Sequence, residues 1–331
     1  MEKKFIIYTI IKVVSSTRIK ITKFHCAIKY TPEKSFQQFA DEVSDARRAG
    51  DIDKAYELIA ETMKLFGNSG YGKTITNKEK FVSTTYGNED NISKKINNPH
   101  FKDLEILYGQ KYEVISTKRE ICQDLPLQIG VAVYHLAKLR MLQFYYQFID
   151  KYIDRSDFQI MQMDTDSNYF AFSEDSIEKL IKPHMREEYE KDKYNFLPSE
   201  SQELHPTFQV DGVRFTWAQF DKRTPGRFKV EAVRDKMICL CSKMYCATDI
   251  TEDPKKDKIS CKGIQKDSNN MNYQKFNNVL FNKHEDKVLN KGFRYVGSSM
   301  KSYEQVKKGL SYCYHKRVVC EDGITTKPLL I

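Results

Sequence analysis

Hydrophobic and polar positions follow two different periodicities along the chain, one typical of strands and one typical of helices. Phe5 to Val14 is rich in Ile, Val, Thr and Tyr and predicts a strand, and Lys20 to Tyr30 predicts a second one. From Thr31 the apolar residues take up helical spacing. A break at Gly50 to Asp53 divides this pattern, so 31–77 is predicted to form two helices in a hairpin.

The longest helical pattern runs from Pro126 to Tyr152 and is apolar around most of its circumference, which predicts a buried helix. His135 within it is interpreted as a core histidine, because no second metal ligand accompanies it. Before this helix, Asn88 to Asn91 and Asn97 to Pro99 predict loops, and Lys111 to Ser116 predicts a strand. We therefore expect an α+β fold.

After the long helix, the charged segment Ser173 to Glu203 predicts a helix and loop on the surface. Short alternating runs separated by turn residues then predict further strands. These runs are Phe208 to Val210, Phe215 to Phe220, Phe228 to Val233 and Met237 to Cys246.

Two carboxylates, Asp164 and Asp166, interrupt the aromatic runs Phe158 to Met163 and Tyr169 to Phe172. This pattern predicts a β-hairpin with the acids at its turn, on one side of the ribbon by the strand period of two. Paired oxygen ligands suit Mg²⁺ that must also hold a substrate phosphate. A plain turn is the alternative, since Asp, Thr, Ser and Asn all favour turns. A calcium loop is excluded, because Tyr169 stands where that loop needs Gly.

The second dense stretch, Lys64 to Thr74, can be interpreted in two ways. Gly67 to Thr74 has the Gly-x-x-x-x-Gly-Lys-Thr spacing of a phosphate-binding P-loop, which would make the chain a P-loop NTPase. Such a loop must follow a strand and open a helix, and that context is missing here. In the favoured interpretation a helix continues through the stretch and places Lys64, Asn68 and Tyr71 on one face.

The composition favours a polyanionic partner. The 331 residues include 54 Lys and Arg against 45 Asp and Glu, a formal net charge of +9. The eight cysteines form no Cys-x-x-Cys pair, so neither a zinc ribbon nor a redox motif is supported. No apolar run is long enough to cross a bilayer, and no convincing targeting signal is present. We expect an intracellular protein that is neither secreted nor membrane-bound.

Both dense stretches resemble motifs of one family, the family B DNA polymerases, of the viral, mobile-element or organellar type. The order of the two motifs agrees with that family, and so does the long helix between them. The resemblance covers about the last nine-tenths of the chain. The matching residues are Lys64, Asn68, Ser69, Tyr71 and Gly72 for motif B, and Asp164, Thr165, Asp166 and Ser167 for motif C.

The resemblance implies a role for each matching residue. Lys64 would hold the triphosphate of a deoxynucleotide, Asn68 would help to order it, and Tyr71, beside Gly72, would face the nascent base pair. Asp164 and Asp166 would bind two catalytic Mg²⁺ ions in a two-metal nucleotidyl transfer.

Two shorter matches lie further along the chain. Lys243-Met244-Tyr245 is similar to the family's primer-terminus element, and 258–264, with Lys258 and Lys262, is similar to its Lys-rich segment at the start of the thumb. Cations there would contact the backbone phosphates of a primer–template.

The resemblance also implies a domain order and an omission. We expect residual palm strands in 1–30, a fingers hairpin in 31–77, a palm with the catalytic hairpin in 78–242 and a thumb in 243–331. No segment matches motif A, whose aspartate shares the metals, and none matches the exonuclease domain. We therefore expect part of a DNA polymerase, lacking an N-terminal portion and inactive or very weak alone. A non-catalytic DNA-binding remnant is the alternative.

Overall fold

The computed structural model describes residues 23, 31, 33–107, 109–251, 257–296, 299–312, 317–321 and 326–328. These residues form a mixture of helices and strands, and every strand pair among them is antiparallel. The expected mixture of helix and antiparallel sheet is therefore confirmed. The two strands predicted before Thr31 lie outside the described residues, apart from Lys23.

The predicted helical hairpin is present. Helix α2 (Gln37–Ile52) leads through a short 3₁₀ turn into α3 (Glu57–Thr74), and the two pack together. The first helix starts later than Thr31 and runs through Gly50, where the sequence predicts a break. A Cβ atom on Gly50 would lie 2.4 Å from the Cβ of Ala60, so this glycine permits the close approach of the two helices.

Polar contacts fasten α2 to the short helix α9 (Trp217–Asp221). The buried Arg48 donates from Nε to the carbonyl of Phe220 at 3.0 Å, and its guanidinium lies 3.7 Å from the Phe220 ring centre. Asp51 accepts two hydrogen bonds from Arg223, just after α9. The stretch around Arg48 and Asp51 therefore orients the helical hairpin.

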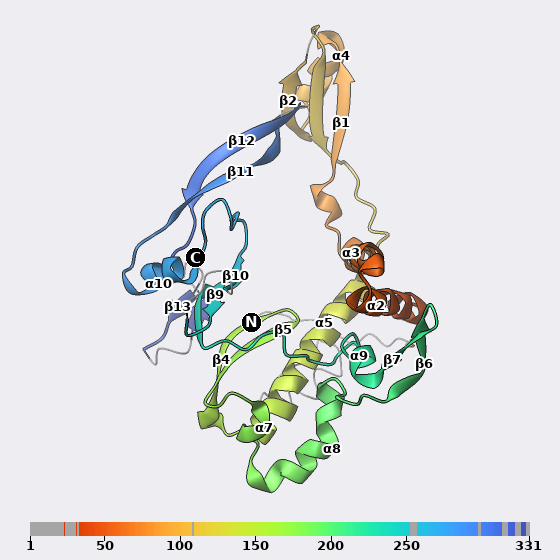
Figure 1. Cartoon of the computed structure of the whole chain (residues 1–331). Coiled ribbons are helices and arrows are strands. Elements are labelled where there is room, and N and C mark those ends of the chain that lie inside the picture. Colours follow the sequence, from red (N-terminus) through yellow and green to blue (C-terminus); the bar gives the residue numbers. More distant parts are fainter. Residues whose placement is uncertain are drawn as a thin grey trace.

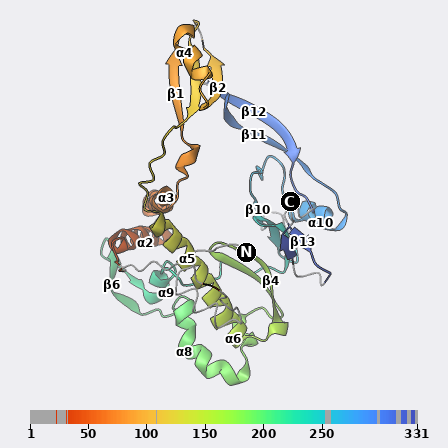
Figure 2. The ribbon, with the colours of Figure 1, turned by 180° about the vertical axis from the view of Figure 1, so that it is seen from behind.

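A small module follows α3 and lies beyond the helical hairpin in both views (Figures 1 and 2). Its strands form a sheet of order β1-β3-β2, separate from every other described sheet. The predicted strand at Lys111 to Ser116 is confirmed, but the predicted loop at Asn88 to Asn91 is wrong, because α4 begins at Glu89. The elements are β1 (Val82–Gly87), α4 (Glu89–Ile96), β2 (Phe101–Ile106) and β3 (Tyr112–Thr117).

The predicted long helix is confirmed in extent. Helix α5 (Leu127–Gln143) continues through a π-helical turn at Phe144–Ile149 into α6 (Asp150–Tyr152). Its second half lies in the larger of the two described cores, whereas Val133, Tyr134 and Leu136 in the first half are about half exposed. The prediction of burial along the whole helix is therefore wrong, and His135 is only partly buried.

The segment after residue 172 returns the chain to this core. The predicted surface helix is confirmed as α8, most of whose residues are exposed, and its Tyr189 and Phe196 are buried against the long helix. The predicted strand Phe215 to Phe220 ends at Thr216, whose side chain and Gln219 form a capping box that starts α9. Phe228 to Val233 is not a strand. The elements are α7 (Ile177–Leu180), α8 (Arg186–Phe196), β6 (Leu204–Val210) and β7 (Val213–Thr216).

The C-terminal lobe has its own core, built from one face of a sheet and helix α10 (Tyr273–Phe281). The sheet has the order β10-β9-β8, and a long ribbon of β11 and β12 projects from the lobe (Figure 1). No helix in the described part of the chain is long and apolar enough to span a membrane. The strands are β8 (Lys236–Cys241), β9 (Met244–Thr248), β10 (Lys258–Cys261), β11 (Lys287–Val296), β12 (Ser299–Lys308), β13 (Arg317–Val319) and β14 (Thr326–Pro328).

Candidate active site

The acidic pair lies at the tip of a β-hairpin, as the sequence predicts. Strand β4 (Phe158–Asp164) pairs with β5 (Ser167–Phe172), and Asp164 is paired directly with Ser167 across a two-residue turn. Asp166 belongs to that turn, so the expectation that strand periodicity places both acids on one side of the ribbon is wrong. Asp164 is partly buried and Asp166 is exposed.

Aromatic packing fixes the hairpin on the long helix. The ring of Phe170 in β5 lies 6.5 Å from Phe144 and 6.0 Å from Phe158, so it packs against the core to which these two residues belong. The helix thus packs against the strands that carry the acids, as the sequence predicts. Because the core holds the hairpin by its apolar side, its acidic tip is presented in a defined direction.

The structure brings the segment Lys243-Met244-Tyr245 to this hairpin. The Lys243 ammonium lies 3.2 Å from Asp164 Oδ2. The hydroxyls of Tyr169 and Tyr245, 76 residues apart in the sequence, form a hydrogen bond of 2.5 Å, and their rings lie 4.8 Å apart. The sequence did not single out Tyr169 as a site residue. The feature that could have indicated it is its position on the strand that follows the two acids.

The turn between β8 and β9 holds the Lys243 backbone in place. Lys243 has a φ of +61°, a strained conformation for a residue other than glycine. Its carbonyl accepts hydrogen bonds from the Lys262 amide at 3.2 Å and from Ser260 Oγ at 3.3 Å. Strand β10 thereby places Lys262 beside Lys243, and Lys258 lies at the start of the same strand.

Tyr245 is a buried phenol that keeps its proton. Burial, followed by the hydrogen bond with Tyr169, raises the pKa of Tyr245 above its ordinary value. A neutral hydroxyl can both donate and accept a hydrogen bond. This part of the site therefore positions groups and does not transfer protons near neutral pH.

The donor set at the hairpin fits Mg²⁺ in part. Mg²⁺ is commonly held by one or two carboxylates, with water and substrate phosphates completing its shell. Asp164 and Asp166 supply such a pair. The ammonium of Lys243 lies beside the Asp164 carboxylate, which shows that a cation can be accommodated there. Within the described ranges, no cluster of three or more His, Cys, Asp or Glu side chains could hold a metal.

The residues that resemble motif B lie on α3, which is helical without interruption through Gly67 to Thr74. The strand–loop–helix context of a P-loop is therefore not present. Lys64 and Asn68 are exposed, and Tyr71 is partly buried. Lys64 pairs with Glu61 at 3.1 Å, and no hydrogen bond or ion pair joins α3 to the β4–β5 hairpin among the described residues.

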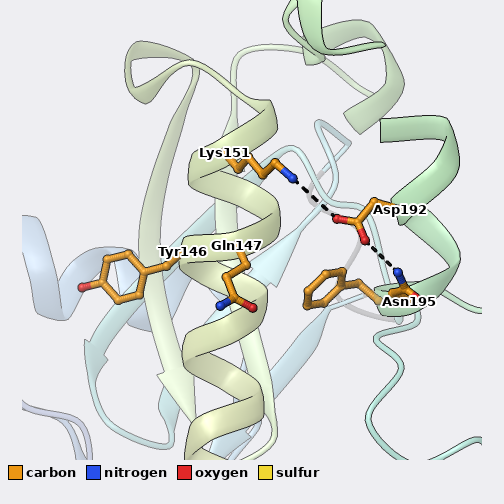
Figure 3. Close-up of a pocket in the computed structure, with 6 residues that line it drawn as sticks. Tyr146, Gln147, Lys151, Asp192 and Asn195 are labelled. Carbon is orange, nitrogen blue, oxygen red and sulfur yellow. Dashed lines mark hydrogen bonds and ion pairs between the residues drawn. The ribbon is translucent and has the colours of Figure 1, made fainter. Parts of the chain in front are cut away.

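An open depression lies elsewhere on the molecule, between the π-helical turn and α8 (Figure 3). Within it Asp192 accepts hydrogen bonds from Tyr152 at 2.9 Å and Asn195 at 2.7 Å, and lies 3.9 Å from Lys151. The depression is lined by Tyr146, Gln147, Lys151, Asp192, Asn195 and Phe196. Because its carboxylate is already paired with three neighbouring side chains, we interpret the depression as a packing contact of α8.

No family model, curated protein or solved structure matches this chain. The assignment of a function therefore depends on the motifs and on the geometry that they adopt. The observation with the most weight is non-local: two predicted elements, Asp164 with its hairpin and Lys243 with Tyr245, meet in space.

Proposed function

We propose that the chain is part of a family B-like DNA polymerase that catalyses template-directed nucleotidyl transfer. The contact of Lys243 and Tyr245 with the Asp164 hairpin carries the proposal. A primer-terminus element must lie beside the metal-binding acids, because the attacking 3′-hydroxyl reacts there. Two elements matched independently in the sequence satisfy this requirement.

The arrangement of the helices supports the same proposal. Helix α3 carries Lys64, Asn68 and Tyr71, and its end packs on the start of α5. Helix α5 leads directly to the hairpin of Asp164 and Asp166. One rigid element thus connects the proposed nucleotide-binding helix with the proposed metal site.

Each residue has a physical task in this proposal. Asp164 and Asp166 hold cations, Lys64 attracts the triphosphate, and Lys243, Lys258 and Lys262 contact backbone phosphates. Gly72 leaves room beside Tyr71 for the base pair. Bound Mg²⁺ would activate the primer hydroxyl and stabilise the pyrophosphate leaving group.

Binding of the correct nucleotide tests the proposal without requiring turnover. We expect Mn²⁺ and the deoxynucleotide complementary to the template to tighten the binding of labelled primer–template by about fivefold or more. Asp166→Asn and Lys64→Met should each remove this gain, whereas Lys54→Met, on the exposed turn before α3, should keep it. Equal affinities with complementary and non-complementary nucleotides would contradict the proposal.

Primer extension tests the expected weakness of the chain alone. The described residues offer carboxylates from a single hairpin, so we expect little or no incorporation. Clear incorporation that Asp166→Ala abolishes would overturn this expectation while supporting the polymerase.

A non-catalytic DNA-binding protein is the second candidate, and the Lys243–Asp164 ion pair is the observation that favours it. An acid neutralised by a neighbouring lysine needs no metal. This candidate predicts DNA binding that weakens steeply with salt and is indifferent to both Mn²⁺ and nucleotide.

A further inference from the structure

The ion pair between Lys243 and Asp164 is a built contact at the site, and its two partners differ in freedom. The Lys243 backbone is held by hydrogen bonds from Lys262 and Ser260. Its side chain is 43% exposed, against 26% for Asp164, and Asp164 is the acid with which it pairs. The ammonium can therefore leave the carboxylate by side-chain rotation while the turn stays in place.

The position of the ammonium conflicts with a divalent cation on the same oxygen. Mg²⁺ binds oxygen ligands at about 2.1 Å and keeps several of its waters. An ammonium 3.2 Å from Asp164 Oδ2 occupies part of that space and repels a second cation through its charge. Lysine and metal therefore compete for one carboxylate.

We propose that Lys243 is a tethered cation that occupies the metal position on Asp164 and is displaced when a divalent cation binds. The inference rests on the proposed function, because it takes Asp164 as a metal ligand. Displacement frees Lys243 to contact a nucleic-acid phosphate, so cation binding and DNA binding support each other. The Tyr169–Tyr245 contact stays formed and keeps the turn beside the hairpin.

The test is the affinity of the protein for Mn²⁺ alone, measured by water-proton relaxation with no DNA or nucleotide present. Lys243→Met keeps the side-chain length and the strained backbone but removes the competitor. We expect it to bind Mn²⁺ about two- to fivefold more tightly than the wild type, the range of a partly exposed ion pair. Lys243→Arg, which keeps the charge, should retain the wild-type affinity.

Two controls isolate the contact. Lys266 is an exposed lysine after β10, and its ammonium donates a hydrogen bond to the Ile259 carbonyl instead of pairing with Asp164. Lys266→Met removes this charge and should leave the Mn²⁺ affinity unchanged. Asp164→Asn should weaken Mn²⁺ binding and abolish the effect of Lys243→Met. Circular dichroism checks folding, and Lys243→Gln replaces Lys243→Met if that variant does not fold.

The possible results separate this inference from the proposed function. If Asp164→Asn weakens Mn²⁺ binding but Lys243→Met leaves it unchanged or weaker, the competition is disproved and the metal site stands. If Asp164→Asn has no effect, or if no variant binds Mn²⁺, both the inference and the metal site are overturned.

Discussion

Arg48 is a buried cation, 5% exposed, and structural contacts account for it fully. It binds the Phe220 carbonyl, stacks on the Phe220 ring and pairs with Asp45 at 2.5 Å. Asp45 is half exposed, so only the arginine side of the pair is costly to bury. The side chain therefore joins α2 to α9 and is not available to a ligand.

Replacing this arginine should destabilise the fold. Arg48→Met leaves the Phe220 carbonyl without its donor and removes the cation–π contact, so we expect a loss of about 2–4 kcal/mol. Urea unfolding followed by circular dichroism measures it. Lys54→Met, a matched change at an exposed position, should cost less than about 0.5 kcal/mol. Equal effects of the two changes would contradict this role.

His205 is a buried histidine held in its neutral form. It is 8% exposed, and its ring stacks 4.2 Å from Phe220. Its Nδ1 accepts hydrogen bonds from the Thr207 and Phe208 amides, which a protonated nitrogen could not do. Burial, followed by the charge of Arg48, lowers the pKa of His205 below its ordinary value.

This lowered pKa predicts a dependence of stability on pH. The folded state binds fewer protons than the unfolded state once the pH falls below about 6.5, the ordinary pKa of histidine. The contribution of neutral His205 to the free energy of unfolding should therefore be fully present above about pH 6.5 and should decline as the pH falls towards the pKa of the folded state. In His205→Asn, which keeps an acceptor, unfolding free energies measured at several pH values should lack this part of the decline. An unchanged profile would disprove the assignment.

At the scale of elements, two helical glycines serve opposite purposes. A Cβ on Gly130 in α5 would lie 2.1 Å from Ile75 Cγ2 and 2.5 Å from Thr74 Oγ1, so this glycine lets α5 meet the end of α3. A Cβ on Gly70 in α3 would meet no described atom within 4 Å. Gly70 weakens its helix without any packing reason, which agrees with a surface that a ligand approaches.

Alanine at these two glycines should therefore change stability in opposite directions. Gly130→Ala is expected to destabilise by about 1–3 kcal/mol, because the branched Ile75 cannot move aside freely. Gly70→Ala is expected to stabilise by about 0.5–1 kcal/mol through higher helix propensity. Urea unfolding of both variants provides the measurement, and the same sign for both would refute the packing of α3 on α5.

The elements that the sequence predicted well are those with a strong period. The helical hairpin, the long helix and the acidic hairpin all carry apolar residues at a regular spacing, although α3 has no fully buried residue. The ribbon of β11 and β12 was not predicted, because much of it is exposed and its apolar residues need not alternate with polar ones. Phe293 and Tyr295, for example, are 77% and 72% exposed. Helix α8 was predicted correctly on the surface because it is mostly charged, whereas the burial of its Tyr189 and Phe196 was not foreseen.

The candidate site could be predicted only in its parts. Asp164 and Asp166 stood out because they interrupt two aromatic runs, and Lys243 with Tyr245 because of the resemblance. Their contact could not be derived from spacing, because it depends on how two hairpins with different cores dock. The role of Tyr169 in holding the two hairpins together could not be predicted, because it depends on the hydrogen bond with Tyr245 in the folded structure.

At the scale of the whole molecule, helices α2 and α3 lie at one end of the long helix, the ribbon of β11 and β12 rises from the C-terminal lobe, and the β1–β3 module lies beyond both (Figure 1). The candidate DNA-binding lysines lie in the C-terminal lobe, beside the acidic hairpin. The net charge of +9 adds a general attraction for nucleic acid.

DNA binding should therefore depend on salt and on particular lysines. We expect Lys262→Ala to weaken binding to any DNA sequence, because its ammonium no longer neutralises a backbone phosphate. The slope of log affinity against log salt should become shallower by about 0.9. Lys191→Ala removes an exposed charge from α8, where Lys191 pairs with Glu187, and should leave the slope unchanged. Titrations at several salt concentrations measure both, and equal slopes for the two variants would contradict the proposed interface.

The position of a primer 3′ end tests the central claim most directly. A primer–template that carries a photoreactive group on the terminal primer base can be cross-linked with Mn²⁺ present, and the attached peptides identified by mass spectrometry. We predict cross-links in β4–β5 and around Lys243 to Tyr245, reduced by Lys243→Met and by Asp166→Asn. Cross-links confined to other segments, or unaffected by both substitutions, would contradict the account.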